Sequence, residues 1–146
     1  MYLKRLELKG FKSFANKTII NLEPGISAIV GPNGSGKSNI CDAILWVLGE
    51  NHVKNLRGSI MEDVIFAGSS EKSAVSLAEV CLVLDNSSNT LPLDYSEVSI
   101  TRRLYRSGEN TYLINDCPVR RLDVTDILHD SVVLVLILIL LLAKEI

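Results

Sequence analysis

Cysteine, histidine and aromatic residues are scarce in this chain of 146 residues. The sequence has three cysteines, two histidines and only 5% aromatic residues. The cysteines, Cys41, Cys81 and Cys117, lie far apart and form no C-x-x-C pair, so the sequence has no metal-binding cysteine spacing. An odd number of widely separated cysteines favours reduced, buried thiols and predicts a cytoplasmic protein.

The chain also lacks a large excess of charge of either sign. Its net charge is −2 and its sequence pI is about 5.7, so bulk charge gives no indication of nucleic-acid binding. Residues 1–5 (Met-Tyr-Leu-Lys-Arg) are charged where a signal peptide would be apolar. The apolar run 132–142 is shorter than the roughly 20 residues of a membrane-spanning helix. We therefore expect no membrane partner.

The most informative stretch is the glycine-rich segment 31–39, Gly-Pro-Asn-Gly-Ser-Gly-Lys-Ser-Asn. Its spacing fits the phosphate-binding loop pattern. Glycines let successive backbone N–H groups curl around a phosphate, and the helix that follows directs its dipole at the same anion. We expect Lys37 to contact the outer phosphates and Ser38 to bind Mg²⁺, a hard cation that prefers oxygen ligands. The expected nucleotide-binding residues of this loop are Gly31, Pro32, Asn33, Gly34, Ser35, Gly36, Lys37, Ser38 and Asn39.

The residues around this loop support the same interpretation. The apolar run 27–30 follows a Pro-Gly turn at 24–25 and predicts a buried strand. Apolar residues recur at helical spacing after the loop and predict a helix over 38–48, with Gly49 at its C-terminal cap. A glycine loop that binds nothing is the weaker alternative in this strand–loop–helix context.

The rest of the chain predicts a mixture of strands and short helices. Residues 59–66 predict a helical turn followed by a strand, 122–129 predict a helix, and Cys117-Pro118 predicts a turn. The further predicted strands cover residues 2–9, 17–22 and 74–84, and a β-hairpin is formed by 98–105 and 111–114.

Several arginines allow two interpretations each. Arg57 lies in the polar segment 50–58, where it either reaches a phosphate of the nucleotide or is solvated. A second group lies on and after the hairpin and either contacts DNA phosphates or forms a solvated face. Its members are Arg102, Arg103, Arg106, Arg120 and Arg121.

Several short stretches, taken together and in order, resemble the N-terminal head segment of the bacterial SMC chromosome-condensation and segregation ATPases. The resemblance covers residues 1–131 almost continuously. The stretches are 10–14 (Gly-Phe-Lys-Ser-Phe), the loop 31–39, 44–50 (Ile-Leu-Trp-Val-Leu-Gly-Glu), 56–59 (Leu-Arg-Gly-Ser), 61–68 and 112–115.

The resemblance implies an α/β fold: the N-terminal lobe of a P-loop, ABC-type ATPase head, with a mixed sheet and an adjoining antiparallel hairpin region. It implies ATP and Mg²⁺ as ligands, with Lys37 and Arg57 in catalytic roles and Lys12 and Ser13 near the nucleoside. The implied partners are a C-terminal head lobe carrying the Walker B acid and signature motif, a second SMC head, kleisin-type accessory subunits and DNA. The implied location is the cytoplasm, in association with the nucleoid.

Other functions compete with this one. The motifs also suit the head of a RecN- or RecF-like DNA-repair ATPase, which would lack a long coiled coil with a central hinge. An inactive remnant, such as a pseudogene product, would carry the same motifs without activity. A small-molecule kinase with a P-loop is the weakest alternative, since the sequence offers no candidate lid or substrate-binding segment.

Residues 132–146 depart from the family, which continues with a glycine-rich stretch and a Ser-Gln-Gly loop. We expect a frameshift after Ser131, because one allowed codon spelling of 138–146, read two bases further on, gives His-Ser-Ile-Ile-Ser-Gln-Gly-Asn. A native buried strand or helix is the alternative. The shifted product would be an apolar, aggregation-prone tail.

The frameshift hypothesis makes a prediction at the level of DNA. Sequencing the codons for residues 132–146 should give a string whose shifted frame encodes the glycine-rich stretch and the Ser-Gln-Gly loop. Codons that cannot be read this way would end the hypothesis.

Overall fold

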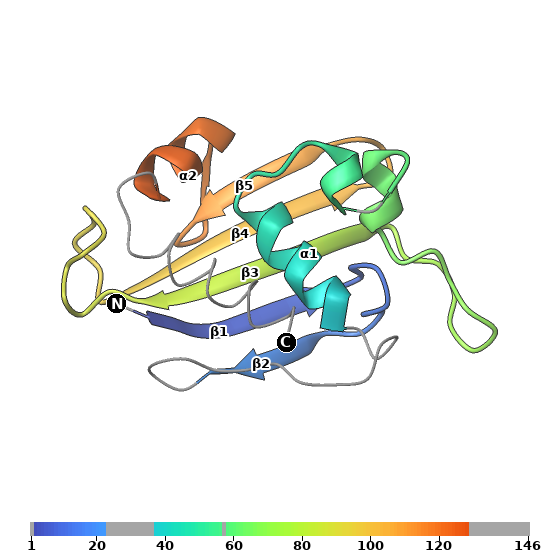
Figure 1. The fold of residues 1–146 in the computed structure, drawn as a ribbon, viewed down its shortest axis with the longest axis horizontal. Helices are drawn as coiled ribbons and strands as arrows, with labels where there is room; N and C mark the ends of the chain where they lie inside the picture. Colours follow the sequence, from blue (N-terminus) through green and yellow to red (C-terminus); the bar gives the residue numbers. More distant parts are fainter. Residues whose placement is uncertain (1, 23–36, 57, 129–146) are drawn as a thin grey trace.

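The described part of the chain is an antiparallel sheet with one helix lying across its face (Figure 1). In this computed structural model, residues 2–22, 37–56 and 58–128 are described. The predicted strand at 27–30, the loop 31–36, Arg57 and the tail 132–146 lie outside these residues.

The sheet has six strands in the order β2-β1-β3-β4-β5-β6, and every neighbouring pair is antiparallel. The strands predicted at 2–9, 17–22 and 74–84 are confirmed, as is the predicted hairpin; this hairpin, β4–β5, is continuous with the rest of the sheet. The strands are β1 (Tyr2–Lys9), β2 (Thr18–Asn21), β3 (Leu77–Asp85), β4 (Glu97–Tyr105), β5 (Asn110–Ile114) and β6 (Cys117–Val119).

The turn predicted at Cys117-Pro118 is wrong, because these two residues belong to strand β6. The chain reverses two residues earlier, at Asn115 and Asp116, whose φ angles are +47° and +65°. Two successive left-handed residues suit a tight hairpin turn, and asparagine and aspartate adopt that conformation more readily than most residues. Pro118 is tolerated because β6 is an edge strand.

Two α-helices and two 3₁₀ turns complete the described residues. The helix predicted over 38–48 is α1 (Lys37–Val47), and the one predicted over 122–129 is α2 (Arg121–Leu128). The 3₁₀ turns are η1 (Val53–Leu56) and η2 (Met61–Val64); the strand expected after η2 is reduced to an isolated bridge between Ile65 and Phe11. No helix within 2–22, 37–56 and 58–128 is long and apolar enough to span a bilayer.

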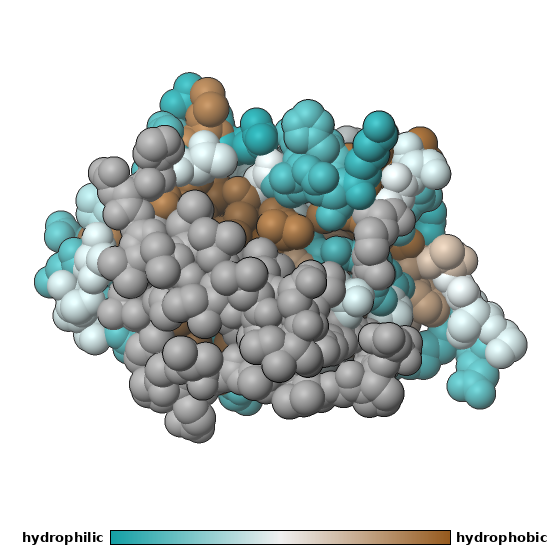
Figure 2. Space-filling view, viewed as in Figure 1, coloured by the Kyte–Doolittle hydropathy of each residue, from teal (hydrophilic) through white to brown (hydrophobic). Residues whose placement is uncertain are grey.

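The core lies between α1 and the sheet. Alternate residues of β3 and β4 point toward α1 and are buried, among them Val80, Leu82 and Ile100. From α1, Ile44 and Trp46 are buried in the same cluster. On the face that carries α1, Figure 2 shows hydrophobic residues toward the centre and hydrophilic residues along the rim above them. This packing fixes the position of the helix expected to hold the phosphates.

The C-terminal end of α1 is closed by a Schellman motif. The Glu50 amide donates to the Leu45 carbonyl at 3.1 Å, and the Gly49 amide donates to the Trp46 carbonyl at 3.1 Å. Gly49 has a φ of +109°, which favours glycine, and a Cβ there would lie 3.3 Å from Thr125 of α2. The predicted glycine cap is therefore confirmed.

Arg102 of β4 is fully buried beside this helix end. Its guanidinium lies 4.7 Å from the ring centroid of Trp46 and 4.9 Å from that of Tyr112. It donates to the Trp46 carbonyl at 2.7 Å and to the Glu50 carbonyl at 2.9 Å, and also to Asn51 Oδ1 at 2.9 Å. Burial lowers the pKa of Arg102 to about 10, so the group keeps its charge at neutral pH.

Both interpretations offered for Arg102, a DNA contact and a solvated residue, are therefore wrong. The remaining arginines of that group are engaged within the protein. Arg103 pairs with Glu79 at 2.7 Å, and Arg120 pairs with Asp123 at 3.1 Å. Arg106 donates to two backbone carbonyls, and Arg121 donates to the Gly49 carbonyl at 2.8 Å.

The cysteines differ in exposure. Cys41 of α1 is buried, as expected, and Cys81 of β3 is partly buried; burial raises the pKa of the Cys81 thiol. Cys117 is exposed, so the expectation of three buried thiols is wrong for this one. The reason is its position in the edge strand β6.

Replacing Arg102 by methionine should destabilise the protein. The change removes a charged donor from three acceptors near the end of α1, and we expect a loss of about 3 kcal/mol in the free energy of unfolding. Urea unfolding followed by Trp46 fluorescence measures it. Arg103→Met is the matched control on the same strand: its pair is partly exposed, so we expect less than about 1 kcal/mol. Equal losses for the two variants would contradict this account of Arg102.

Candidate nucleotide-binding site

The described part of the candidate site begins at the first turn of α1. Lys37 is the first residue of the helix, and Ser38 follows it, half-buried. The first turn contains no acidic residue, so no carboxylate of that turn offsets the positive end of the helix dipole. At the other end, Arg102 and Arg121 donate to the last carbonyls, where cations are favourable. The first turn of α1 is therefore chemically suited to binding an anion.

The loop 10–14 runs along one side of α1, in contact with it at three successive residues. The rings of Phe11 and Trp46 lie 5.3 Å apart. The Lys12 ammonium lies 2.7 Å from Asp42 Oδ2. Asn39 Nδ2 donates to Ser13 Oγ at 2.8 Å. The helix partners at 39, 42 and 46 share one face, so the loop fixes both the rotation of the helix and its position along its axis.

The backbone of this loop is itself held in place by the segment after η2. Gly10 has a φ of +65°, and a Cβ there would collide with the Leu77 carbonyl oxygen. The Gly10 carbonyl accepts from the Phe66 amide at 2.8 Å, and the Lys12 amide donates to the Val64 carbonyl at 2.6 Å. The close approach of Leu77 and the positive φ explain why position 10 needs a glycine, and the two hydrogen bonds explain how the loop keeps its path.

Lys12 connects α1 to a second segment. Besides Asp42, its ammonium donates to the Leu56 carbonyl at the end of η1. Leu56 directly precedes Arg57 in the sequence. One side chain therefore bridges the helix and the segment that leads to Arg57.

A pocket of about 200 Å³ opens beside Lys12. Asp63 forms part of its wall and accepts hydrogen bonds from the amides of Ser59 at 2.7 Å and Ile60 at 3.0 Å. These N–H groups, chiefly that of Ile60, hold the pKa of Asp63 below its ordinary value. The pocket is lined by Lys12, Val53, Leu56, Gly58, Ile60, Asp63 and Val64.

The structure places some of the predicted site residues together. Lys12, Ser13, Ser38 and Asn39 lie on or against the N-terminal half of α1. The side chain of Lys37 and the residues 31–36 and 57 are outside what is described. Sequence analysis missed Asp42, although an acid on a largely apolar helix signals a buried partner.

The comparison with protein families decides the identity of the fold. A family model described as the RecF/RecN/SMC N terminal domain matches residues 2–136. The chain belongs to this family. Within it, the chain corresponds to the N-terminal head segment of the SMC type, which confirms the resemblance and the P-loop, ABC-type fold class.

Curated relatives and solved structures agree. The chromosome partition protein Smc of Mycobacterium leprae is 60% identical over 131 residues, 90% of this chain and 11% of that protein. A structure from work on ATP-driven dimerization and DNA-stimulated activation of SMC ATPases has a TM-score of 0.86 at 42% identity, covering 91% of this chain and 81% of that chain. The Smc head of Pyrococcus furiosus, bound to the C-terminal domain of ScpA, has a TM-score of 0.84 at 46% identity, covering 88% of this chain and 32% of that one.

The chain thus spans about a tenth of the curated SMC relatives that it matches. The RecF alternative has weaker support: a RecF–ATP structure shares the fold with a TM-score of 0.61 but only 22% identity, over 82% of this chain and 28% of that chain. The SMC-type head is therefore the better supported of the two.

The hydrogen bonds that Asp63 accepts in the pocket wall of this SMC-type head should be lost in acid. Its pKa is lowered in the folded protein, so its hydrogen bonds are fully present above the ordinary value of 3.8 and are lost as pH falls through the lowered pKa. NMR shifts of the Ser59 and Ile60 amides should therefore change with a midpoint below 3.8. Asp63→Asn should remove that transition, and a midpoint above the ordinary value would contradict the assignment.

Proposed function

We propose that this chain is the ATP-binding N-terminal lobe of an SMC-type head, with residues 1–131 as the lobe and 132–146 as an aberrant tail. The single observation that supports ATP binding most strongly is the first turn of α1. This turn follows a phosphate-loop sequence, is free of acidic residues, and is positioned from its side by the loop 10–14. The alignments to curated relatives span 131 residues, the length of the proposed lobe, and the family model extends a little further, to residue 136.

The residues present suit a nucleoside triphosphate and its metal. The loop 31–36 and the first amides of α1 bind the phosphates, with Lys37 supplying a positive charge. Ser38 supplies a hydroxyl oxygen of the kind that Mg²⁺ prefers, and the bound ion neutralises phosphate charge. Lys12, which lines the pocket, and Ser13 would be the residues near the nucleoside. Arg57, which follows Leu56, completes the set as a residue that approaches the phosphates.

The wider role follows from the relatives. The curated relatives are named chromosome partition proteins, and two of the solved SMC heads are bound to ScpA. By this relation the intact protein hydrolyses ATP, pairs with its C-terminal lobe and a second head, binds a kleisin-type subunit and DNA, and acts in the cytoplasm at the nucleoid. Hydrolysis needs the Walker B acid and signature motif of the C-terminal lobe, so this chain alone binds ATP without sustained turnover.

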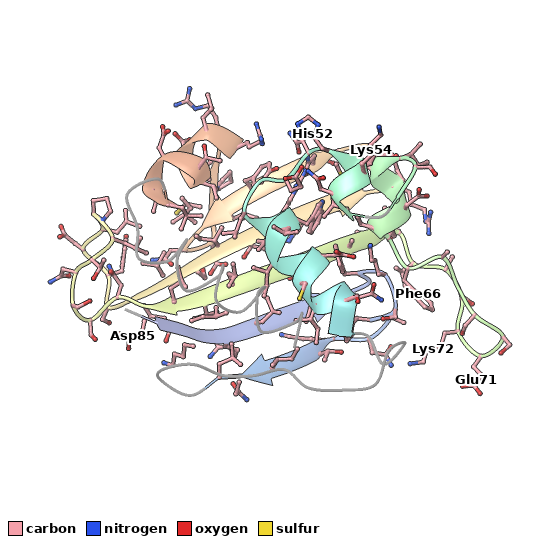
Figure 3. All side chains as sticks on the ribbon, viewed as in Figure 1. His52, Lys54, Phe66, Glu71, Lys72 and Asp85 are labelled. Atoms are coloured by element: carbon pink, nitrogen blue, oxygen red, sulfur yellow. The ribbon has the colours of Figure 1, made fainter. Side chains whose placement is uncertain are left out.

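A binding titration tests the proposal. The full 146-residue chain is titrated with a fluorescent ATP analogue and Mg²⁺, beside Lys37→Ala. Loss of a charge-assisted contact to phosphate should weaken binding by roughly 10- to 100-fold. Lys72→Ala, at the tip of the projecting loop in Figure 3, is the matched control and should bind like the unchanged protein.

Three outcomes would contradict the proposal. Equal affinity in the Lys37 and Lys72 variants would mean that the loop does not hold the phosphates. Sustained hydrolysis that disappears in Lys37→Ala would mean that the chain needs no second lobe. A folded protein with no detectable binding would favour the inactive remnant.

A further inference from the structure

We propose that Lys12 is a positioning residue: its ammonium holds the segment that leads to Arg57 against helix α1, and it influences nucleotide binding through Asp42 and Leu56. The effect on nucleotide rests on the function proposed above. The contact itself does not, because it joins only residues of this chain.

The Lys12–Asp42 pair is built into the protein interior. The side chains are 13% and 4% exposed, and Nζ lies 2.7 Å from Oδ2. Two charges are kept away from water only where their geometry is good and further hydrogen bonds satisfy them. Removing either charge therefore removes an ion pair that is largely shielded from water. The pair is therefore a strong local constraint, unlike the exposed ion pairs of the sheet.

The second hydrogen bond of Lys12 connects the ion pair to the segment that leads to Arg57. Asp42 lies one helical turn after Ser38, on the side of α1 that faces the loop 10–14. The Leu56 carbonyl, which accepts from the same ammonium, belongs to the peptide bond that joins Leu56 to Arg57. We therefore expect a displacement of α1 along its axis to be transmitted through the Lys12 side chain to the Leu56 carbonyl.

The backbone of Lys12 supports this interpretation. Its φ is +48°, a left-handed conformation that is unfavourable for a residue with a side chain. The Lys12 amide is fixed by the Val64 carbonyl at 2.6 Å, and Phe11 on one side and Ser13 on the other contact α1. This conformation directs the ammonium to its two acceptors, so the arrangement depends on both neighbouring segments.

A role as a direct nucleotide ligand predicts something different. A ligand lysine would lose its contact when replaced, but neutralising Asp42 would leave its charge available to the phosphates. A positioning lysine needs Asp42, so either substitution should loosen the same segment. A double-mutant cycle separates the two roles.

The experiment uses the full 146-residue chain with Lys12→Met, Asp42→Asn and the double variant. Affinity for the fluorescent ATP analogue with Mg²⁺ is measured for each. We expect each single variant to bind about tenfold more weakly, and the double variant to bind no more weakly than Lys12→Met alone. Asp42→Asn binding as tightly as the unchanged protein, or losses that add in the double variant, would overturn the proposal. Lys72→Met is the control for the loss of an exposed lysine charge.

A second measurement needs no nucleotide. Amide hydrogen exchange is followed at residues 53–56 and 58–60, with the strands β3 and β4 as an internal check of folding. We expect faster exchange there in Lys12→Met and in Asp42→Asn, with β3 and β4 unchanged. Protection equal to that of the unchanged protein would overturn the proposal. Asp42→Asn nearly preserves size and supplies a second test if Lys12→Met does not fold.

The two measurements distinguish this inference from the proposed function. Lys37→Ala should weaken binding by the roughly 10- to 100-fold given above and leave exchange at 53–56 as it is in the unchanged protein. If the chain binds no nucleotide, the proposed function fails, and the exchange experiment still decides whether Lys12 holds the segment.

Discussion

The buried guanidinium of Arg102 holds the C-terminal end of α1 to the sheet, and the position of the candidate site depends on this contact. The group lies between two aromatic rings and donates to two carbonyls at the helix end. Arg121 of α2 donates to a third carbonyl in the same cap. Since α1 has no basic residue in its own last turn, other elements supply the cations that its dipole favours.

The loop 10–14 fixes the rotation of α1 and its position along its axis. Its contacts at Trp46, Asp42 and Asn39 are spaced along one side of α1 and reach its first turns. The sheet thus fixes the position of α1 in two ways. Strand β4 holds its C-terminal end, and the loop after β1 holds its side. The first turn of α1 contains no acidic residue, which suits the phosphate binding that we propose for it.

The sequence predicted much of this fold because local signals were strong. Helical spacing and a glycine defined α1 and its cap, and alternation defined the strands. The β5–β6 turn was misplaced because Cys117-Pro118 looked like a turn, whereas Asn115 and Asp116 adopt the left-handed conformation. Arg102 was misread as a surface residue, yet it alternates in register with Ile100 and Leu104, both of which face α1. Counting by two along β4 would have placed it in the core.

The site itself was predictable only in part. The phosphate-loop pattern predicts nucleotide-binding residues that lie in one continuous stretch of sequence, and these residues stay a prediction. The Lys12–Asp42 pair joins residues 30 positions apart, and the bond to Leu56 spans 44 positions. Such contacts depend on the tertiary arrangement of loop, helix and 3₁₀ turn, which no local pattern in one sequence encodes.

The most direct test of this account is an NMR titration of the backbone amides with ATP and Mg²⁺. If the first turn of α1 holds the phosphates, the amides of Ser38 and Asn39 should shift most among the described residues, and those at the tip of the projecting loop, Glu71 and Lys72, should not shift. Shifts of equal size at both places, or none at the start of α1, would contradict the central claim that the sheet positions this helix to bind an anion.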